Sequence, residues 1–471
     1  MHRTGWVCRT GDEKAVTQVP FTGFLALSEW FSLTTLKNMN AHSQNQSPQT
    51  AVTAVMAKPL VLWGYPLLEV LRTCQVQSNP EATPAFGRGP FGMFHGSDRP
   101  WTHEDRDIVT PSCDLLYYNA WIWIGASPVR LHIPPNHGRY YVVQLMDAWS
   151  ENFHNVGLRN TPAEGADWWL IHTEDPMPAG IDPARVVRCP TRLVWLLGRA
   201  LVGDLSDVPK ARAFADGVQL QGSGPRPSCV SQWRDSGHAA DDFFANLLQA
   251  VDEIGVPSNA SDLRPLMRSL RLPPGGLDAL ERSSQRVREG LRHAYSEGIH
   301  LIEQHIVNLT RKPWTWSPHL GIWGDNILMR ATVAMKGLGA LAATETLYAQ
   351  ADFDADSEPL HGQHGYTLRF EGGHMPPADA FWSVSLYGED RYFAANPMGR
   401  YAIGDRTKGL RLGQDNSLTL QIQHERPAEG DANWLPAPSG PFYLILRMYH
   451  PREEMLNGRY TLPPVQRVKE R

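Results

Sequence analysis

Three stretches in the last quarter of the chain alternate apolar and polar residues with a period of two. In residues 381–387, Trp382 and Leu386 lie on one side and serines on the other, and residues 418–424 and 442–449 repeat the pattern. Successive side chains of a strand point to opposite faces, so each stretch predicts a strand with one apolar and one polar face. Since Gly- and Pro-rich turns separate them, the three strands predict an antiparallel sheet, half buried in a sandwich or jelly roll.

Further strands are predicted in the first half of the chain. Short apolar or alternating stretches bounded by turn residues cover residues 129–133, 140–149, 167–172 and 185–187, and a longer apolar segment covers residues 191–203. We therefore expect a second β-rich unit in this half.

Helical periodicity dominates the middle of the chain. In residues 241–254, apolar positions at i, i+3, i+4 and i+7 follow two acidic residues, which indicates a helix start. Residues 277–308 and 327–347 predict two more helices, and residues 54–70 predict a buried helix kinked at Pro66. The predicted fold is mainly β with a helical insert (α+β).

These elements divide the chain into four parts. Residues 1–53 are polar and lack periodicity, which predicts a disordered leader, and Met39 is an alternative start of the protein. Residues 54–222 form the predicted N-terminal β-rich domain, and residues 223–325 a linker and helical segment. Residues 326–467 form a helix plus a C-terminal β-sandwich domain.

Composition narrows the class of protein. A chain of 471 residues is too long for one ordinary core, and 16 tryptophans with 37 prolines favour β architecture with aromatic-lined pockets. A net charge of −5 argues against a nucleic-acid partner. No apolar run approaches about 18 residues, so we expect no membrane span. Five scattered cysteines suit reduced thiols and a cytoplasmic protein.

Seven motifs together resemble a known family. They are residues 110–117 (Thr-Pro-Ser-Cys-Asp-Leu-Leu-Tyr), 138–141 (Gly-Arg-Tyr-Tyr), 144–149 (Gln-Leu-Met-Asp-Ala-Trp), 376–383 (Pro-Pro-Ala-Asp-Ala-Phe-Trp-Ser), 396–404 (Asn-Pro-Met-Gly-Arg-Tyr-Ala-Ile-Gly), 422–424 (Ile-Gln-His) and 433–441 (Asn-Trp-Leu-Pro-Ala-Pro-Ser-Gly-Pro). The chain resembles the two-part family of domains of unknown function 1254 (N-terminal) and 1214 (C-terminal). The resemblance implies two jelly-roll or β-sandwich-like domains joined by helices, and it supplies no mechanism. Relatives often carry a secretion signal. Where relatives usually carry Asn, this chain has Ser112 or Cys113 beside Asp114.

Polar residues in the first half form one candidate group. Asp147 lies near the end of an apolar strand, where an ionised carboxylate needs a partner, and we consider it a general acid or base. Arginine is a bidentate partner for such carboxylates. Substrate-binding roles are predicted for four further residues, Asp114, Tyr117, Arg139 and Tyr140. The alternative is a structural ion pair that anchors loops to the sheet.

A second candidate group comes from the C-terminal half. His424 ends a strand, and we choose it as the catalytic acid or base because an unperturbed imidazole titrates at about pH 6.5. Four substrate-binding residues are predicted with it, namely Tyr387, Arg400, Asn433 and Trp434. Polar groups at strand ends beside a rigid aromatic suit the mouth of a ligand site, here a hollow shared by Arg400, His424 and Trp434. The alternative is loop anchoring through backbone hydrogen bonds.

Cofactor motifs are sparse. His361 and His364 form an HxxH pair that could bind zinc or iron, but they occupy a glycine-containing turn, so no cofactor is predicted. The chain has no GxSxG or GxxxxGK[ST] motif, and no GxGxxG motif that follows a predicted strand.

Three functions stay open. The first is a nucleotide-independent enzyme that acts on a small, partly apolar molecule by hydrolysis or proton transfer, as a hydrolase or isomerase would. The second is a non-catalytic binding or assembly protein, and the third a metal-dependent oxygenase or hydrolase. A small-molecule ligand is the expected partner, and a homo-oligomer is possible.

Overall fold

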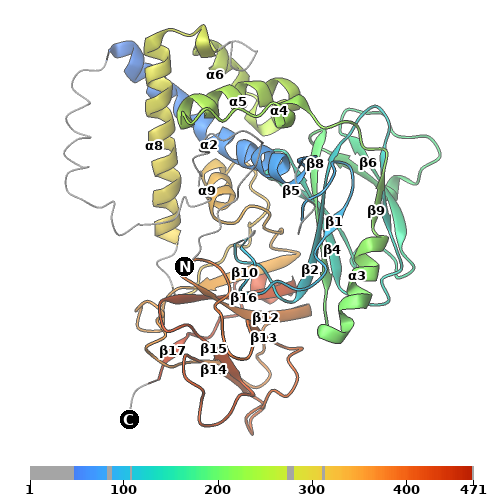
Figure 1. Ribbon diagram of the computed structural model, residues 1–471, viewed down its shortest axis with the longest axis vertical. Coiled ribbons are helices and arrows are strands. Elements are labelled where there is room, and N and C mark those ends of the chain that lie inside the picture. The colour runs from blue at the N-terminus through green and yellow to red at the C-terminus, as the bar shows by residue number, and fades with distance from the viewer. Residues whose placement is uncertain (1–46, 82–86, 107–108, 273–279, 310–312, 469–471) are drawn as a thin grey trace.

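The computed structural model describes residues 47–81, 87–106, 109–272, 280–309 and 313–468. Two β-sandwiches are joined by helices, which confirms the predicted fold class (Figure 1). Most of the predicted disordered leader lies outside the described residues. Its last part does not: the first described helix, α2, begins at Pro48, before residue 54.

Two sheets form the first sandwich. The strand order is β1-β2-β8-β4-β5 in one sheet and β7-β6-β3-β9 in the other. The first sheet holds β1 (His95–Gly96), β2 (Leu115–Trp123), β8 (Leu193–Leu201), β4 (Tyr141–Asp147) and β5 (Asn152–Gly157). The second holds β7 (Val186–Cys189), β6 (Ala166–His172), β3 (Val129–Ile133) and β9 (Gln219–Gln221). Alternate residues such as Leu131, Val143 and Leu196 fill the core between them and are fully buried.

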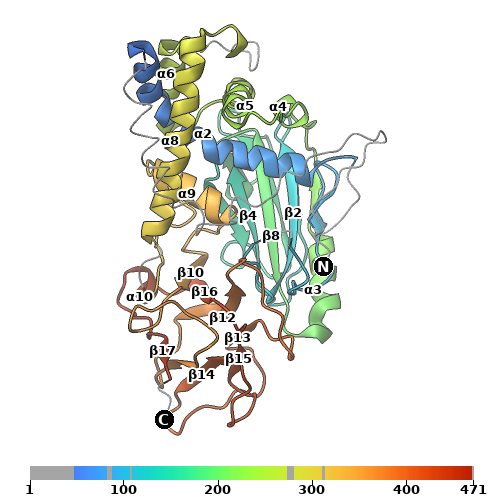
Figure 2. The ribbon, with the colours of Figure 1, turned by 60° about the vertical axis from the view of Figure 1, so that its left-hand side comes forward.

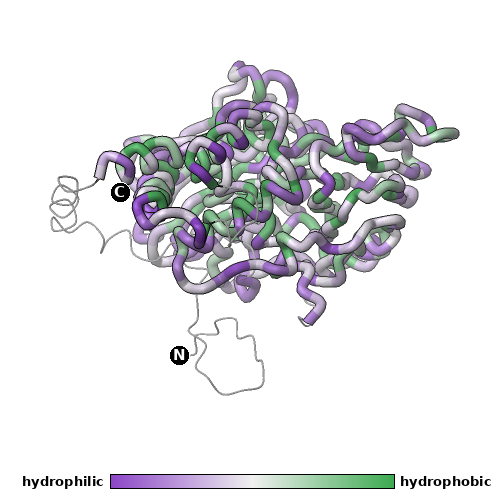
Figure 3. The backbone as a smooth tube through the Cα atoms, turned by 90° about the horizontal axis from the view of Figure 1, so that it is seen from above, coloured by the Kyte–Doolittle hydropathy of each residue, from purple (hydrophilic) through white to green (hydrophobic). Residues whose placement is uncertain are grey.

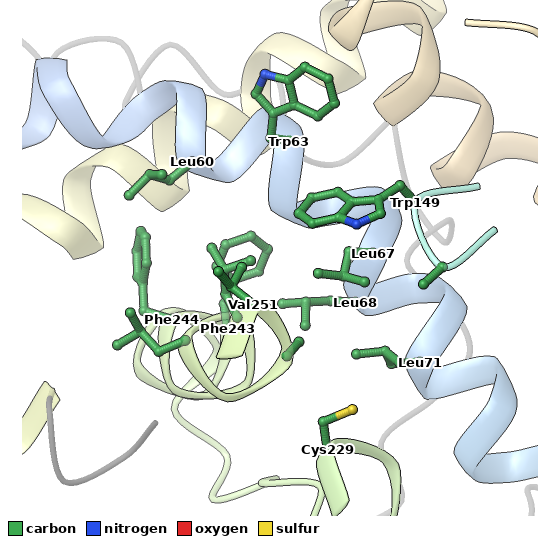
Figure 4. Packing of buried hydrophobic residues seen from close by; sticks show 14 of the residues in the cluster. Leu60, Trp63, Leu67, Leu68, Leu71, Trp149, Cys229, Phe243, Phe244 and Val251 are labelled. Carbon is green, nitrogen blue, oxygen red and sulfur yellow. The ribbon is translucent and has the colours of Figure 1, made fainter. Parts of the chain in front are cut away.

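Helices cover the other face of the first sheet. Helix α2 (Pro48–Gln77) lies along this face with α4 (Ser228–Ser231), α5 (Ala239–Ile254) and α9 (Ile327–Gly337) beside it, and α6 (Leu263–Ser269) and α8 (Gln285–Leu309) pack on α2 (Figure 2). Helix α3 (Val208–Gly217) instead places Phe214 and Ala215 in the core between the two sheets. Leu60 and Leu67 of α2 pack with Phe243 and Phe244 of α5 and with Trp149, which follows β4 (Figure 4). The predicted helix over 327–347 ends at Gly337, and a strand follows it.

Helix α2 is long and apolar enough to cross a membrane by length and composition. It packs as a core helix, because more than half of its most apolar window is buried by the protein. Glycines of α8 permit the contact: a Cβ at Gly290 would lie 2.5 Å from Thr53, and one at Gly298 would lie 2.6 Å from Val61.

The second sandwich also has two sheets. One holds β10 (Thr346–Ala351), β16 (Phe442–Pro451), β12 (Ala378–Gly388) and β13 (Ala402–Gly404), in that order. The other holds β15 (Trp434–Pro436), β14 (Leu418–Gln423), β11 (Tyr366–Phe370) and β17 (Gln466–Arg467). The three period-two stretches are strands, as predicted, but they do not form one sheet. Strands β12 and β16 pair with each other, whereas β14 belongs to the facing sheet.

Both faces of β12 and β16 are buried. Every residue of β16 is buried, and so are the residues of β12 from Phe381 to Tyr387. The apolar side of each strand packs in the core of the second sandwich, and the other side faces the first sandwich. Seen from above, hydrophobic segments lie mostly toward the middle of the molecule and hydrophilic loops around it (Figure 3). The predicted half-buried sheet is therefore covered on both sides, since a second domain packs on its polar face.

Candidate functional site

The polar side of β12 and β16 forms a buried layer between the two sandwiches. Ser383 and Ser385 of β12 and Arg447 of β16 are at most 3% exposed. Their hydrogen-bond partners include Thr110 and Asp114, which precede β2 in the first sandwich. Buried polar groups are usually hydrogen-bonded. The hydrogen bonds of this layer therefore show which residues of the two sandwiches contact each other.

Asp114 joins the two sandwiches. Its carboxylate accepts hydrogen bonds from Ser383 Oγ at 2.7 Å, Arg406 Nη2 at 2.8 Å and Ser112 Oγ at 3.2 Å. The guanidinium of Arg406 also lies over the ring of Phe381, 4.2 Å from its centroid. The carboxylate predicted to bind substrate thus bridges two domains.

Tyr140 takes part in a second bridge. Its hydroxyl donates to Glu345 Oε1 at 2.8 Å, and His450 Nε2 donates to the same oxygen at 3.0 Å. The Glu345 side chain is 6% exposed. The Tyr140 ring meets the rings of Phe381 and Tyr449 nearly edge-on, with centroids 5.4 Å away in each case. One buried oxygen therefore fixes side chains from β16 and from the start of β4.

Arg447 is buried without an acidic partner. It donates to the hydroxyl of Tyr387 at 2.7 Å, to Ser385 Oγ at 3.2 Å and to the carbonyl of Thr110 at 2.7 Å. It also lies 5.7 Å from the ring centroid of Tyr348 and 5.6 Å from that of Tyr387. All of these partners are neutral, and none of the ion pairs formed by the described residues includes Arg447.

Arg199 of β8 has similar surroundings on the opposite side of the interface. It is 5% exposed and donates to Gln144 Oε1 at 2.8 Å and to the carbonyl of Gly339 at 2.9 Å. Its guanidinium lies 5.6 Å from the ring centroid of Tyr117. In the part of the chain that the structure describes, Arg199 too has no carboxylate partner.

Partly exposed side chains lie near both arginines. Burial raises the pKa of Tyr348, and the charges of Arg199 and Arg447 both act on its hydroxyl. Tyr348 is nevertheless only half-buried, as are three other side chains that pack on the aromatic cluster of Trp101, Tyr387 and Tyr443, namely Cys113, Tyr117 and Tyr401. We call Tyr117, Arg199, Tyr348, Tyr387 and Arg447 the interdomain site.

A lysine and an aspartate lie near Tyr443 of the aromatic cluster. Burial lowers the pKa of Lys336, in the last turn of α9, to about 8. Burial also raises the pKa of Asp352, on which the charge of Lys336 acts, and Asp352 in turn acts on Tyr443. Lys336 therefore supplies an amine that can exchange a proton near neutral pH.

Two predicted residues of the first sandwich anchor loops. Asp147 Oδ1 accepts hydrogen bonds from the backbone N–H groups of Trp149 and Glu151, each at 2.9 Å. Arg139 donates to both carboxylate oxygens of Asp207, at 2.6 and 2.7 Å. Arg139 and Asp207 form an ion pair, as the structural alternative describes, whereas Asp147 holds its loop through backbone hydrogen bonds alone.

Asp147 makes stability depend on pH. Burial raises the pKa of its carboxyl from 3.8 to about 6, so the folded protein binds the proton more tightly than the unfolded chain. Stability from this group is fully present below about pH 4 and is lost as the pH rises through about 6. In the parent protein this group should lower the free energy of unfolding by about 2 kcal/mol as the pH rises through this window. We expect Asp147→Asn, which keeps the accepting oxygen, to remove that decline. Urea unfolding at pH 4 to 7 measures it, and a variant as pH-dependent as the parent contradicts it.

The predicted group around β15 also holds loops. Arg400 donates to the carbonyl oxygens of Asp431 at 2.5 Å and Trp434 at 2.9 Å, and the amide of Asn433 donates to two backbone carbonyls. Trp434 is 3% exposed. His424 lines a concavity that none of these three residues lines, although the indole N–H of Trp434 donates to the carbonyl of the neighbouring Gln423 at 2.9 Å.

The HxxH pair does not present two free lone pairs. Nδ1 of His361 accepts a hydrogen bond from the N–H of Gln363, and Nδ1 of His364 accepts one from Arg467 at 2.7 Å. Across the described ranges, no group of three or more His, Cys, Asp or Glu side chains is arranged to hold a metal ion.

The sequence analysis missed Arg199, Lys336, Glu345 and His450. A signal existed for Arg199, because it is a lone charge within the apolar run that became β8. Arg447 lies in the period-two stretch 442–449, but no role was predicted for it. Nothing in the sequence around Glu345 predicted its two donors, which come from strands distant along the chain.

Family comparisons cover both sandwiches. Residues 91–222 match the family described as "Protein of unknown function (DUF1254)", and residues 345–453 match "Protein of unknown function (DUF1214)". The order along the chain is the predicted one. None of the curated proteins compared with the chain matches it.

A solved structure shares the architecture. The VPA0106 protein from Vibrio parahaemolyticus is similar over 88% of this chain and 100% of its own, with a TM-score of 0.66 and 21% sequence identity. An uncharacterized protein from Burkholderia cenocepacia matches 89% of this chain and 95% of its own, with a TM-score of 0.46 and 13% identity. The first comparison shows a common fold.

Proposed function

We propose that this chain, which belongs to the two-part family joining DUF1254 to DUF1214, binds a small anionic molecule with an apolar body at the interdomain site. One observation carries the proposal. Arg199 and Arg447 are both buried, and only neutral groups accept hydrogen bonds from them among the described residues.

An anion would supply what these arginines lack. A buried charge without a counter-charge is costly, and carbonyls, hydroxyls and aromatic faces offset only part of that cost. A carboxylate or similar group accepts charge-assisted hydrogen bonds from guanidinium, which are stronger than those between neutral groups. Binding would therefore relieve an electrostatic penalty that the folded protein already contains.

The surroundings favour an apolar body on that anion. Tyr117 and Tyr348 are half-buried, and both pack on the aromatic cluster. Aromatic rings offer large apolar contact area and can stack against a flat ligand. A small aromatic carboxylate combines both properties.

Proton transfer or hydrolysis is the reaction class we propose for this site. Lys336 is the residue we assign to proton transfer, because a group whose pKa lies near the working pH serves well as an acid or base. This replaces the sequence-based choice of His424 and Asp147, which lie on other parts of the fold.

Benzoate and benzyl alcohol test the binding proposal, since they share a ring and differ in charge. By isothermal titration calorimetry, we expect benzoate to bind at least about tenfold more tightly than benzyl alcohol. Arg199→Met should lower the affinity for benzoate by about tenfold or more. Arg411→Met, at an exposed arginine of the second sandwich, should leave that affinity unchanged. Equal binding of the two compounds, or benzoate binding that survives Arg199→Met, contradicts the proposal.

A further inference from the structure

The end of the second sandwich that carries β14 and β17 has a concavity of its own. Its volume is about 480 Å³, within the range of sites for small molecules. Nine residues line it: Gly362, Gln363, His364, Gly365, Gln423, His424, Glu425, Ser439 and Val468. It is formed by the loop before β11, the end of β14 and the chain after β17, and none of the interdomain residues lines it.

Close backbone contact holds the wall of this concavity in place. The N–H of Gly362 donates to the carbonyl of Gly440 at 2.9 Å, and a Cβ at Gly362 would lie 1.7 Å from the carbonyl oxygen of Pro438. The N–H of Val468 donates to the carbonyl of Gly365 at 2.8 Å. Only glycine fits at residue 362, so the two loops are fixed against each other before any ligand arrives.

The proton of His424 has a definite position. Nδ1 lies 2.9 Å from the carbonyl oxygen of Ala437. A carbonyl oxygen can only accept, so Nδ1 carries a proton, and in the neutral ring Nε2 carries the lone pair. His424 is exposed at the concavity and therefore offers a hydrogen-bond acceptor there.

His364 has the opposite arrangement. Its Nδ1 lies 2.7 Å from Nη2 of Arg467, and a guanidinium can only donate. Nδ1 of His364 therefore accepts, and the ring proton is on Nε2. Two imidazoles that line one concavity are thus held as opposite tautomers, one an acceptor and the other a donor.

We propose that this concavity is a second ligand site that takes a small neutral molecule through a carboxamide edge. The amide N–H of the ligand donates to Nε2 of His424, and its carbonyl accepts from Nε2–H of His364. Glu425, which lines the concavity, and Arg467, which donates to His364, carry opposite charges, so their sum favours neither an anion nor a cation. Gln363 and Gln423 add amide groups that can satisfy the remaining donor and acceptor of a carboxamide.

Benzamide and acetophenone separate this proposal from simple apolar binding. The two have nearly the same shape, but acetophenone has a methyl group where benzamide has its N–H donors. In NMR titrations that follow the imidazole resonances, we expect benzamide to shift His364 and His424 saturably and to bind about tenfold more tightly than acetophenone. The ¹⁵N shifts of the free protein should show protonated Nδ1 in His424 and protonated Nε2 in His364.

Variants complete the test. His424→Phe and His364→Phe should each lower the affinity for benzamide about tenfold. His374→Phe, at an exposed histidine of the same sandwich, should leave that affinity unchanged. Val468→Trp fills the concavity from a position that is 49% exposed and should abolish binding without disturbing the fold. The proposal is overturned if benzamide does not saturate, if acetophenone binds equally, if Val468→Trp binds normally, or if either tautomer is reversed.

Discussion

Glu345→Ala is expected to lower the free energy of unfolding by about 3 to 5 kcal/mol. The carboxylate oxygen of Glu345 is the shared acceptor for Tyr140 and His450, and all three side chains are buried. Removing it leaves two donors in the interior without partners, and each unpaired donor costs about 1 to 3 kcal/mol. The truncated side chain adds a cavity term. Urea unfolding followed by tryptophan fluorescence measures the loss.

Glu345→Gln is the matched control. The two hydrogen bonds converge on Oε1, and glutamine keeps an accepting oxygen there. We expect this variant to lose about 1 kcal/mol or less, because only the charge is removed. If the glutamine variant is as unstable as the alanine variant, the negative charge is what matters and the proposed role of a shared acceptor is wrong.

Arg330→Met should also lower the free energy of unfolding by about 3 to 5 kcal/mol. Arg330 of α9 has a 2% exposed side chain and pairs with Glu151 at 2.6 Å. It also donates to the carbonyl of Trp149 at 3.3 Å and lies 5.0 Å from the ring centroid of Trp63. Methionine fills much of the volume but leaves Glu151 without its cation. Because these contacts tie α9 to α2 and to the loop after β4, the loss should appear as a lower melting temperature of the whole protein.

Arg452→Met provides the comparison for an exposed ion pair. The side chains of Arg452 and Asp379 are 56% and 64% exposed, and their atoms lie 2.7 Å apart. Solvent and salt weaken such pairs, so we expect a change within about 1 kcal/mol. If Arg330→Met and Arg452→Met lower the free energy of unfolding by similar amounts, burial does not determine how much these ion pairs stabilise the fold.

Local pattern predicted most of the strands. The strand predicted over residues 129–133 is β3, Val129–Ile133, with the same bounds, and the two stretches of alternation at residues 381–387 and 442–449 lie within β12 and β16. Alternation shows that two faces differ in polarity. It does not show what covers each face, and for this reason the burial of Ser383, Ser385 and Arg447 by another domain could not be read from the pattern.

The candidate site was predicted in part. Asp114, Tyr117, Tyr140 and Tyr387 do lie at the interface between the sandwiches, and their roles in binding stay predictions. His424 lies at the β14–β17 end of the second sandwich. It was chosen for its residue type and its position at a strand end, and neither tells which end of a sandwich meets another domain. The partners of Glu345 are more than 100 residues away along the chain, so no local pattern could have joined them.

Strand β16 has one further consequence. Leu444, Leu446 and Met448 belong to the core of one sandwich, while Arg447 and Tyr449 belong to the junction with the other. Neighbouring codons of one short segment are therefore constrained by different halves of the protein. Recombination that exchanged either half alone would break contacts that the other half had been selected to make, so the halves are expected to be inherited as a pair.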